Sequence, residues 1–190
     1  AGGFYVTDEQ IDSVLDTKIL HIGGVGLMGA MDKGCTKEIM QEAKAQGCIT
    51  TLDVFASAQK DFSLIEPLLP STDYLMPSEE AMALSGLTDF EKVCSLLLEK
   101  GAKAVVLTLG ADGAMYRDQT GLSFQVPAFD IDVVCTCGCG DCFNAGFATG
   151  LHLGLSPQNC VRMAQASSAQ NALGLGSQAV VSDLAATQAF

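Results

Sequence analysis

A glycine-punctuated loop that leads directly into a helix is the feature that most constrains this chain. Gly138 and Gly140 lie in this loop, and we expect a helix that has Asp141 in its first turn and ends near Leu153. Glycine lets the backbone turn tightly and approach a ligand closely. The start of a helix presents unpaired N–H groups and a partial positive charge, which suit an anion such as phosphate. A carboxylate at Asp141 can take a proton from a hydroxyl brought to that anion, so the pattern predicts phosphoryl transfer to an alcohol.

Composition narrows the class of protein. The chain has 190 residues, which predicts one domain over residues 1–190 with enough volume for a core. Its hydrophobic content of 48% is high, but no apolar run approaches the ~18 residues that cross a membrane. The N-terminus shows no signal-peptide pattern. A high apolar fraction without a spanning segment favours a sheet that is buried on both faces, and no membrane association is expected.

The charge is strongly acidic. Ten basic and 22 acidic residues give a net charge of −12, and the pI is near 4.3. This field disfavours nucleic acids and anionic membranes as partners. Any phosphate site must therefore be local and made of backbone dipoles. Eight cysteines without a secretion signal predict reduced thiols and a cytoplasmic location.

Apolar runs alternate with helical patterns along the chain, which indicates βαβ units. Thr36 and Thr88 are expected to cap two of the helices, and Pro67 and Pro70 to stop a short helical stretch that begins at residue 61. The expected class is α/β, a three-layer α/β/α sandwich with a mostly parallel sheet. Ligands of such sheets bind at the carboxyl ends of the strands. Strands are expected at residues 18–22, 49–54, 73–76, 104–109, 114–116 and 123–126, and helices at 7–15, 36–47, 78–86, 88–101, 141–153 and 157–173.

Three segments resemble the PfkB (ribokinase-like) carbohydrate kinases. Residues 135–143 resemble the family pattern Asp-Thr-x-Gly-Ala-Gly-Asp followed by a small residue and Phe. Residues 107–113 look like its Thr-Leu-Gly-x-x-Gly segment, which lies along ATP, and residues 75–80 resemble its Asn-x-x-Glu region. The three segments occur in the family's order, and the likeness runs from about Lys18 to the C-terminus. The first segment is specific, whereas the other two would be weak alone.

The resemblance implies transfer of the ATP γ-phosphoryl group to a hydroxymethyl group of a sugar or related small molecule. ATP and Mg²⁺ are the cofactors it implies, and a homodimer is one assembly it allows. In such chemistry the protein mainly positions groups and stabilises charge. By this resemblance the general base is Asp141, the anion hole is formed by Gly138, Cys139 and Gly140, the nucleotide is lined by Thr108, Gly110 and Gly113, and Glu80 acts on Mg²⁺ through water.

The chain departs from the family pattern in three ways. Cys135 replaces the Asp that helps to hold a monovalent cation, so a cation site of the usual form is not expected. Pro77 or Ser78 stands where the Mg²⁺ motif has Asn. Members of the family are usually longer, so we expect this chain to lack the N-terminal strands, the β-sheet lid and most of the sugar site. A truncated, non-catalytic nucleotide-binding homologue is therefore an alternative.

A second alternative is a dinucleotide-binding module. Gly24, Gly26 and Gly29 follow a predicted strand as Gly-x-Gly-x-x-Gly, and Asp53 follows at a distance not far from that of the NAD fingerprint. Against it, a helix should open at these glycines, but residues 32–34 interrupt it before Thr36. A wide strand-to-helix connection is the simpler interpretation.

The four crowded cysteines at 135, 137, 139 and 142 have two interpretations. Their spacing is not that of paired zinc ligands, and small thiols bury easily, so packing is favoured over a metal or redox role. A thiolate of low pKa is predicted at Cys139 or Cys142 if the helix start stabilises one.

Overall fold

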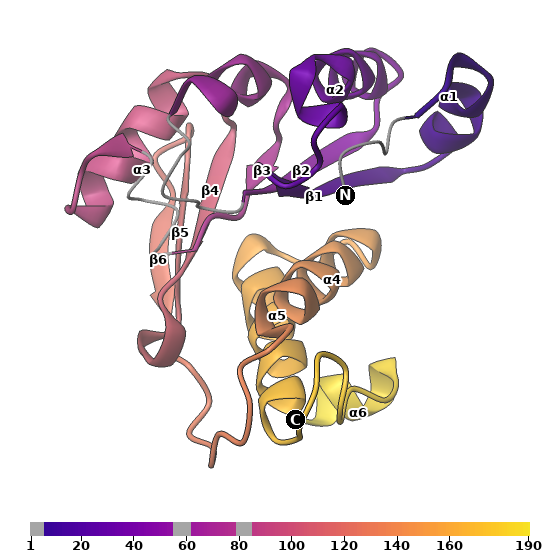
Figure 1. Cartoon of the computed structure of the whole chain (residues 1–190). Coiled ribbons are helices and arrows are strands. Elements are labelled where there is room, and N and C mark those ends of the chain that lie inside the picture. Colours follow the sequence, from indigo (N-terminus) through magenta and orange to yellow (C-terminus); the bar gives the residue numbers. More distant parts are fainter. Residues whose placement is uncertain (1–5, 55–61, 79–84) are drawn as a thin grey trace. The chain divides into compact units, whose positions relative to one another are not determined.

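The computed structural model describes residues 6–54, 62–78 and 85–190. The described residues form six strands in one sheet whose spatial order follows the sequence (Figure 1). The first four strands pair in parallel, with Ile19 opposite Ile49 and Tyr74 opposite both Thr51 and Ala104. The strands are β1 (Ile19–Val25), β2 (Ile49–Val54), β3 (Tyr74–Leu75), β4 (Ala104–Thr108), β5 (Ala114–Asp118) and β6 (Ser123–Val126).

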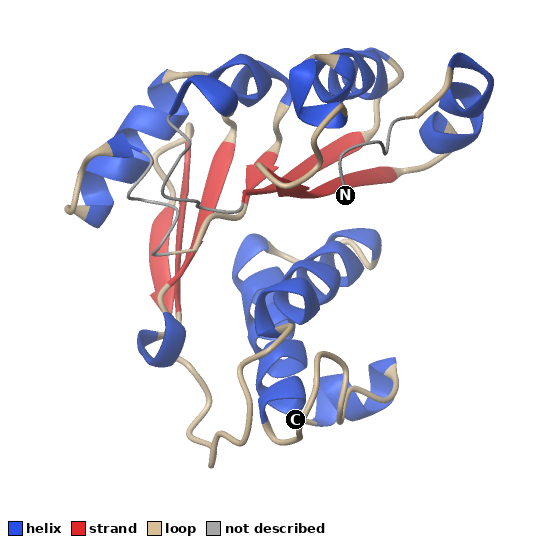
Figure 2. Ribbon diagram, in the orientation of Figure 1, coloured by secondary structure: helices blue, strands red, loops and turns tan. Residues whose placement is uncertain are grey.

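Helices alternate with the first strands and then follow the sheet (Figure 2). The predicted α/β class is confirmed, as is the run of helices after the sixth strand. The α-helices are α1 (Asp8–Leu15), α2 (Cys35–Ala45), α3 (Phe90–Glu99), α4 (Cys139–His152), α5 (Pro157–Ala172) and α6 (Leu184–Ala189). Short 3₁₀ helices cover Met31–Lys33, Phe62–Leu64, Glu66–Ser71 and Gly110–Asp112.

The chain divides into two compact units. The first contains Ala1–Leu107 and Arg117–Leu122, and the second contains Thr108–Tyr116 and Ser123–Phe190. In the first unit, β4 is buried along nearly its whole length, as expected for a strand covered on both faces. In the second unit, α4 and α5 pack closely, because Gly146 and Gly150 of α4 face the backbone of α5.

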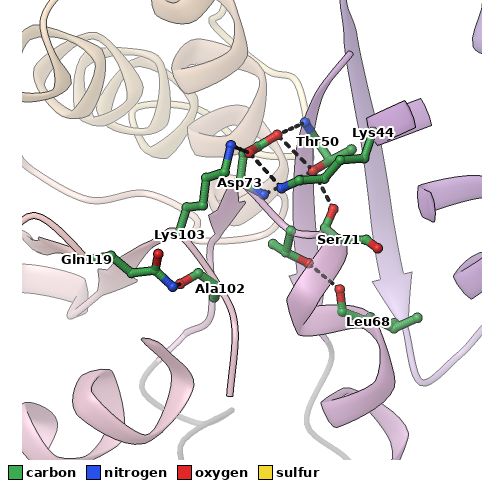
Figure 3. A network of polar contacts seen from close by, with 9 residues as sticks. Lys44, Thr50, Leu68, Ser71, Asp73, Ala102, Lys103 and Gln119 are labelled. Carbon is green, nitrogen blue, oxygen red and sulfur yellow. Dashed lines mark hydrogen bonds and ion pairs between the residues drawn. The ribbon is translucent and has the colours of Figure 1, made fainter. Parts of the chain in front are cut away.

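A polar network joins the starts of three neighbouring strands in the first unit (Figure 3). Asp73, which precedes β3, accepts hydrogen bonds at one carboxylate oxygen from the N–H and hydroxyl of Thr50, at 2.9 and 3.1 Å. Its other oxygen pairs with Lys44 at 3.0 Å and Lys103 at 2.6 Å. Burial raises the pKa of Asp73, but Lys103, the Thr50 backbone and Lys44 together lower it below 3.8. The network therefore fixes the strand starts, at the edge opposite the one where ligands are expected.

Local signals at several predicted helix ends were wrong. Gly34 precedes α2, so Thr36 lies inside the helix, where its hydroxyl donates to Met31 O at 2.9 Å. Asp89, not Thr88, caps α3 by accepting the N–H groups of two following residues. Proline is tolerated near the start of a helix, where its missing N–H costs little.

The 3₁₀ helix Glu66–Ser71 contains both prolines that were predicted to end a helix, with Pro67 near its start and Pro70 in its interior. The strand predicted at 18–22 continues through two glycines to Val25. Most of the helix predicted at 78–86 lies outside the described residues. α6 was not predicted.

Candidate active site

The loop before α4 ends at a glycine that no other residue can replace without strain. Gly138 has φ 76° and ψ 2°, a left-handed conformation that glycine adopts freely. A Cβ atom at this position would lie 2.4 Å from the carbonyl oxygen of Ser177. The chain can therefore turn into the helix here only because Gly138 has no side chain.

The first turn of α4 leaves two backbone donors without acceptors. The N–H of Cys139 donates to Thr136 O at 3.1 Å, and that of Cys142 donates to Gly138 O at 2.9 Å. Among the described residues, no acceptor is seen for the N–H groups of Gly140 and Asp141. A Cβ atom added at Gly140 would meet nothing within 4 Å. Two donors at the positive end of a helix dipole are thus unpaired, and there is open space beside Gly140, an arrangement that can bind an anion.

Asp141 lies in the same turn and is exposed. Its carboxylate is not turned into the interior of the second unit, so a hydroxyl can reach it from solvent. An exposed carboxylate next to free N–H donors can accept a proton while the donors hold an anion. Of the predicted anion-hole residues, Gly140 offers a free donor, whereas the N–H of Cys139 is already bonded to the loop.

Asn171 of α5 holds the loop in place, and sequence reasoning missed it. Its side chain is fully buried, and its amide nitrogen donates to Cys137 O at 2.7 Å. Its amide oxygen accepts the N–H of Ala179 at 3.2 Å. The N–H groups of Val134 and Cys135 donate to the next carbonyl, Ala172 O, at 2.8 and 3.2 Å. A buried amide on an alanine-rich helix face was the signal in the sequence, because such groups need polar partners.

The second predicted loop, residues 108–113, is a tight turn after β4. The N–H of Leu109 donates to Gly113 O at 2.9 Å. Gly113 has φ 96°, and a Cβ atom there would lie 2.1 Å from Val126 O. Gly110 also has a positive φ, but a Cβ atom there would meet nothing within 4 Å. Gly113 is therefore needed for packing, while Gly110 lies beside open space. Thr108, at the end of β4, is partly exposed.

Both loops are linked to α5, the 136–138 loop directly and the 108–113 loop through β6. The amide nitrogen of Gln165 donates to Val126 O at 2.9 Å, and the side chain of Gln125 donates to Asp112 O at 2.9 Å. Gln165 is 6% exposed, and its amide oxygen is the buried side-chain oxygen that lacks a partner among the described residues. Gln165 and Asn171 are about 9 Å apart along the helix at 1.5 Å per residue. One rigid helix thus sets the spacing of the two loops.

The cysteine thiols differ from the prediction. The pKa of Cys142 is raised, by burial first and then by the negative charges of Cys139 and Asp141, so the predicted low-pKa thiolate at Cys142 is wrong. The pKa of Cys135 is lowered instead, by the backbone N–H groups of Gly176 and Cys137. Within the described ranges, no group of three or more His, Cys, Asp or Glu side chains is arranged to hold a metal ion.

The remaining predicted sites are not part of these two loops. Glu80, predicted to act on Mg²⁺, is outside the described residues. In the loop of Gly24, Gly26 and Gly29, the carboxylate of Asp32 accepts the N–H groups of Gly26 and Met28 at 3.0 and 2.9 Å. The following α-helix begins only at Cys35. A carboxylate already fills the position that a dinucleotide phosphate would need, so the geometry does not support the dinucleotide interpretation.

Comparisons with known proteins found relatives of this chain. The family model described as pfkB family carbohydrate kinase matches residues 4–184. The ATP-dependent 6-phosphofructokinase of Thermoanaerobacterium thermosaccharolyticum is 28% identical over 86% of this chain and 52% of its own length. The ribokinase of Lactococcus lactis subsp. lactis is 32% identical over 58% of this chain and 36% of its own.

A solved structure also matches. A protein from E. coli, proposed to be a ribokinase II and solved in complex with ATP and Mg²⁺, superposes with a TM-score of 0.83 at 25% identity. The match covers 94% of this chain and 60% of the E. coli protein, which confirms the ribokinase-like fold. This chain spans about half the length of the curated relatives it matches. None of the helices in the described part of the chain combines the length and apolarity that a membrane crossing requires. The extent of the family match and the agreement of fold show that this chain belongs to the pfkB family of carbohydrate kinases.

Proposed function

We propose that the complete protein transfers the γ-phosphoryl group of ATP to a hydroxymethyl group of a sugar or related small molecule. The observation that carries this proposal is the first turn of α4. There an exposed carboxylate, Asp141, lies in the same turn as the unpaired N–H groups of Gly140 and Asp141. Membership of a family of carbohydrate kinases supplies the reaction class, and the ATP complex of the E. coli relative supplies the phosphoryl donor.

The chemistry assigned to these residues is simple. The Asp141 carboxylate accepts the proton of the acceptor hydroxyl. At the same time the hydroxyl oxygen attacks the γ-phosphorus, and the P–O bond to the leaving nucleoside diphosphate breaks. The N–H groups of Gly140 and Asp141 donate to the phosphoryl oxygens as negative charge develops on them. Cys139 and Gly138 shape this turn, because one donates to the loop and the other allows the left-handed conformation.

The nucleotide is assigned to the open side of the second loop. Gly110 leaves space there, and Thr108 lies at the end of β4, whereas Gly113 holds the turn against residues 126–128. Mg²⁺ bound with the nucleotide would neutralise phosphate charge. Its predicted partner Glu80 lies outside the described residues, so we assign no step to it.

The proposed setting is the cytoplasm. All eight cysteines are free thiols in the structure, as expected for a reducing compartment. The net charge of −12 argues against nucleic acids as partners. The proposed partners are therefore small molecules, and a homodimer stays a prediction.

Replacing Asp141 by Asn in the complete protein tests the proposal. We expect kcat to fall by about two to four decades, because a general base is lost, while nucleotide affinity changes little. Steady-state kinetics over a panel of sugars, sugar phosphates and nucleosides, with nucleotide binding measured by calorimetry, would provide both numbers.

Asp130→Asn is the matched control, because Asp130 is an exposed carboxylate of the same unit in the loop before α4. It should keep kcat within about twofold of wild type. A similar small loss in Asp141→Asn would refute the role of Asp141. Tight nucleotide binding with no turnover of any acceptor would favour the non-catalytic homologue.

A further inference from the structure

Three of the five cysteine thiols of the second unit donate a hydrogen bond to a backbone carbonyl. The Sγ of Cys139 donates to Ser168 O at 3.6 Å, that of Cys142 to Ser177 O at 3.7 Å, and that of Cys160 to Leu155 O at 3.5 Å. A thiol that donates to a carbonyl is stabilised in its neutral form. Burial acts in the same direction and raises the pKa of Cys160 to about 11. Burial also raises the pKa of Cys142, so Cys142 and Cys160 are poor nucleophiles.

Cys135 has the opposite surroundings. Its sulfur accepts a hydrogen bond from the N–H of Cys137 at 3.4 Å and another from the N–H of Gly176. The thiol of Cys137 contributes to lowering the pKa of Cys135 as well. Donors surround this sulfur, so they stabilise a thiolate and lower its pKa. Cys135 is partly exposed and Cys137 is exposed, so a small solute can reach both.

We propose that Cys135 and Cys137 form a peroxide-sensitive dithiol, in which Cys135 is oxidised first and Cys137 then closes a disulfide. The proposal stands on the 3.4 Å hydrogen bond from the N–H of Cys137 to the Cys135 sulfur, which brings that sulfur beside the residue that would close the disulfide, and on the exposure of both thiols. It does not rest on phosphoryl transfer, because both the modification and its readout concern the thiols alone.

The chemistry balances with hydrogen peroxide as the oxidant. The Cys135 thiolate attacks one peroxide oxygen, the O–O bond breaks, and the departing hydroxide takes a proton to become water. The Cys137 thiolate then attacks the sulfur of the sulfenic acid, the S–O bond breaks, and a second water forms. Two thiols are oxidised to one disulfide as one peroxide is reduced, and a small thiol reductant restores the dithiol.

The new bond would close directly before Gly138. Asn171 binds the carbonyl of Cys137, and Ala172 O accepts the N–H of Cys135, so both residues are already tied to α5. A disulfide adds a constraint between these two anchored positions. It would alter the turn that precedes α4 and so the position of the first N–H groups of that helix. We therefore also expect oxidation to change the binding of inorganic phosphate at that turn.

Alkylation and peptide mass spectrometry of the complete protein test the proposal. Cys160 with a pKa about two units above 9.0 holds at least about 100-fold less thiolate at neutral pH than Cys135. The lower intrinsic nucleophilicity of Cys135 reduces this to about tenfold. Iodoacetamide should therefore label Cys135 at least about tenfold faster than Cys160. After treatment with peroxide, the peptide that contains both Cys135 and Cys137 should lose two hydrogens.

Variants of the two cysteines separate oxidation of Cys135 from closure of the disulfide. In Cys137→Ser the sulfenic acid at Cys135 should persist and be trapped by dimedone. The matched control Cys142→Ser should form the disulfide as wild type does. Labelling of Cys135 at the rate of Cys160 would overturn the proposal. A disulfide that involves Cys139 or Cys142 would also overturn it. So would oxidation of Cys137 in Cys135→Ser at the rate seen for the wild-type pair. Circular dichroism of each variant would verify that it folds.

Discussion

Gly138 and Gly140 are separated by one residue, yet they face different surroundings. Gly138 adopts a left-handed conformation and lies against the backbone at Ser177. Gly140 lies inside α4 and faces open space. The first glycine is therefore needed for the fold, and the second is needed only if something occupies that space.

Alanine at each position should separate these roles. Gly138→Ala should lower the free energy of unfolding by about 2–4 kcal/mol, from left-handed strain and overlap with Ser177. Gly140→Ala should keep or raise stability by up to about 1 kcal/mol, because alanine favours a helix. It should nonetheless weaken nucleotide binding or turnover, since its methyl group enters the space assigned to phosphate.

Urea unfolding and calorimetry with ATP measure the two effects in each variant. A fully active Gly140→Ala protein would contradict the placement of the phosphate. A Gly138→Ala protein as stable as wild type would contradict the close contact with Ser177.

At the scale of elements, α4 and α5 lie so close that glycine is required at their contact. A Cβ atom on Gly146 would lie 2.8 Å from Ala164 Cα and 2.9 Å from Met163 O. Backbone atoms cannot yield as a flexible side chain can, so the helices would have to separate. Since α5 carries Gln165 and Asn171, such a movement would also disturb both loops.

Gly146→Ala should therefore lower the free energy of unfolding by about 1–3 kcal/mol, despite the better helix propensity of alanine. Ala145→Ser, on the exposed side of the same helix, should stay within about 0.5 kcal/mol of wild type. Thermal unfolding followed by circular dichroism provides the comparison. Equal midpoints for the two variants would show that the helices can separate freely.

The elements show what sequence patterns can and cannot predict. The buried β-branched runs predicted β2 at residues 49–54 and the location of β4, because strand propensity and burial are local properties. The caps at Thr36 and Thr88 failed because a better-placed neighbour started each helix. The resemblance located the Gly138–Asp141 turn, but Asn171 and Gln165 bind Cys137 and Val126, which lie 34 and 39 positions away along the chain. Such contacts arise only when the elements pack.

At the scale of the whole molecule, two electrostatic effects act in opposite directions as the pH falls. The net charge of −12 produces self-repulsion that weakens as carboxylates are protonated. Asp73 acts the other way, because its folded pKa lies below its ordinary value of 3.8. Its charged form stabilises the fold above the unfolded pKa, and this contribution is lost as pH falls through the folded pKa.

We therefore expect the unfolding midpoint to stay level or rise slightly from pH 7 to about pH 5, and to fall below about pH 4. Asp73→Asn should be less stable by about 1–3 kcal/mol at pH 7, a range reduced because Lys103 is largely exposed. The unfolding midpoint of Asp73→Asn should fall less below pH 4 than that of the wild-type protein. Thermal scans from pH 3 to pH 7 on both proteins check this, and parallel profiles would exclude Asp73 as a cause.

The dependence of both loops on α5 has a consequence for protein engineering. Moving the glycine turns alone into a new scaffold would transfer the peptide that meets the ligand but not the amides that hold it. A successful graft would have to include the 16-residue helix from Pro157 to Ala172 as a single part, with its buried glutamine and asparagine intact. The smallest transplantable unit of this site is therefore a helix with two turns attached to it.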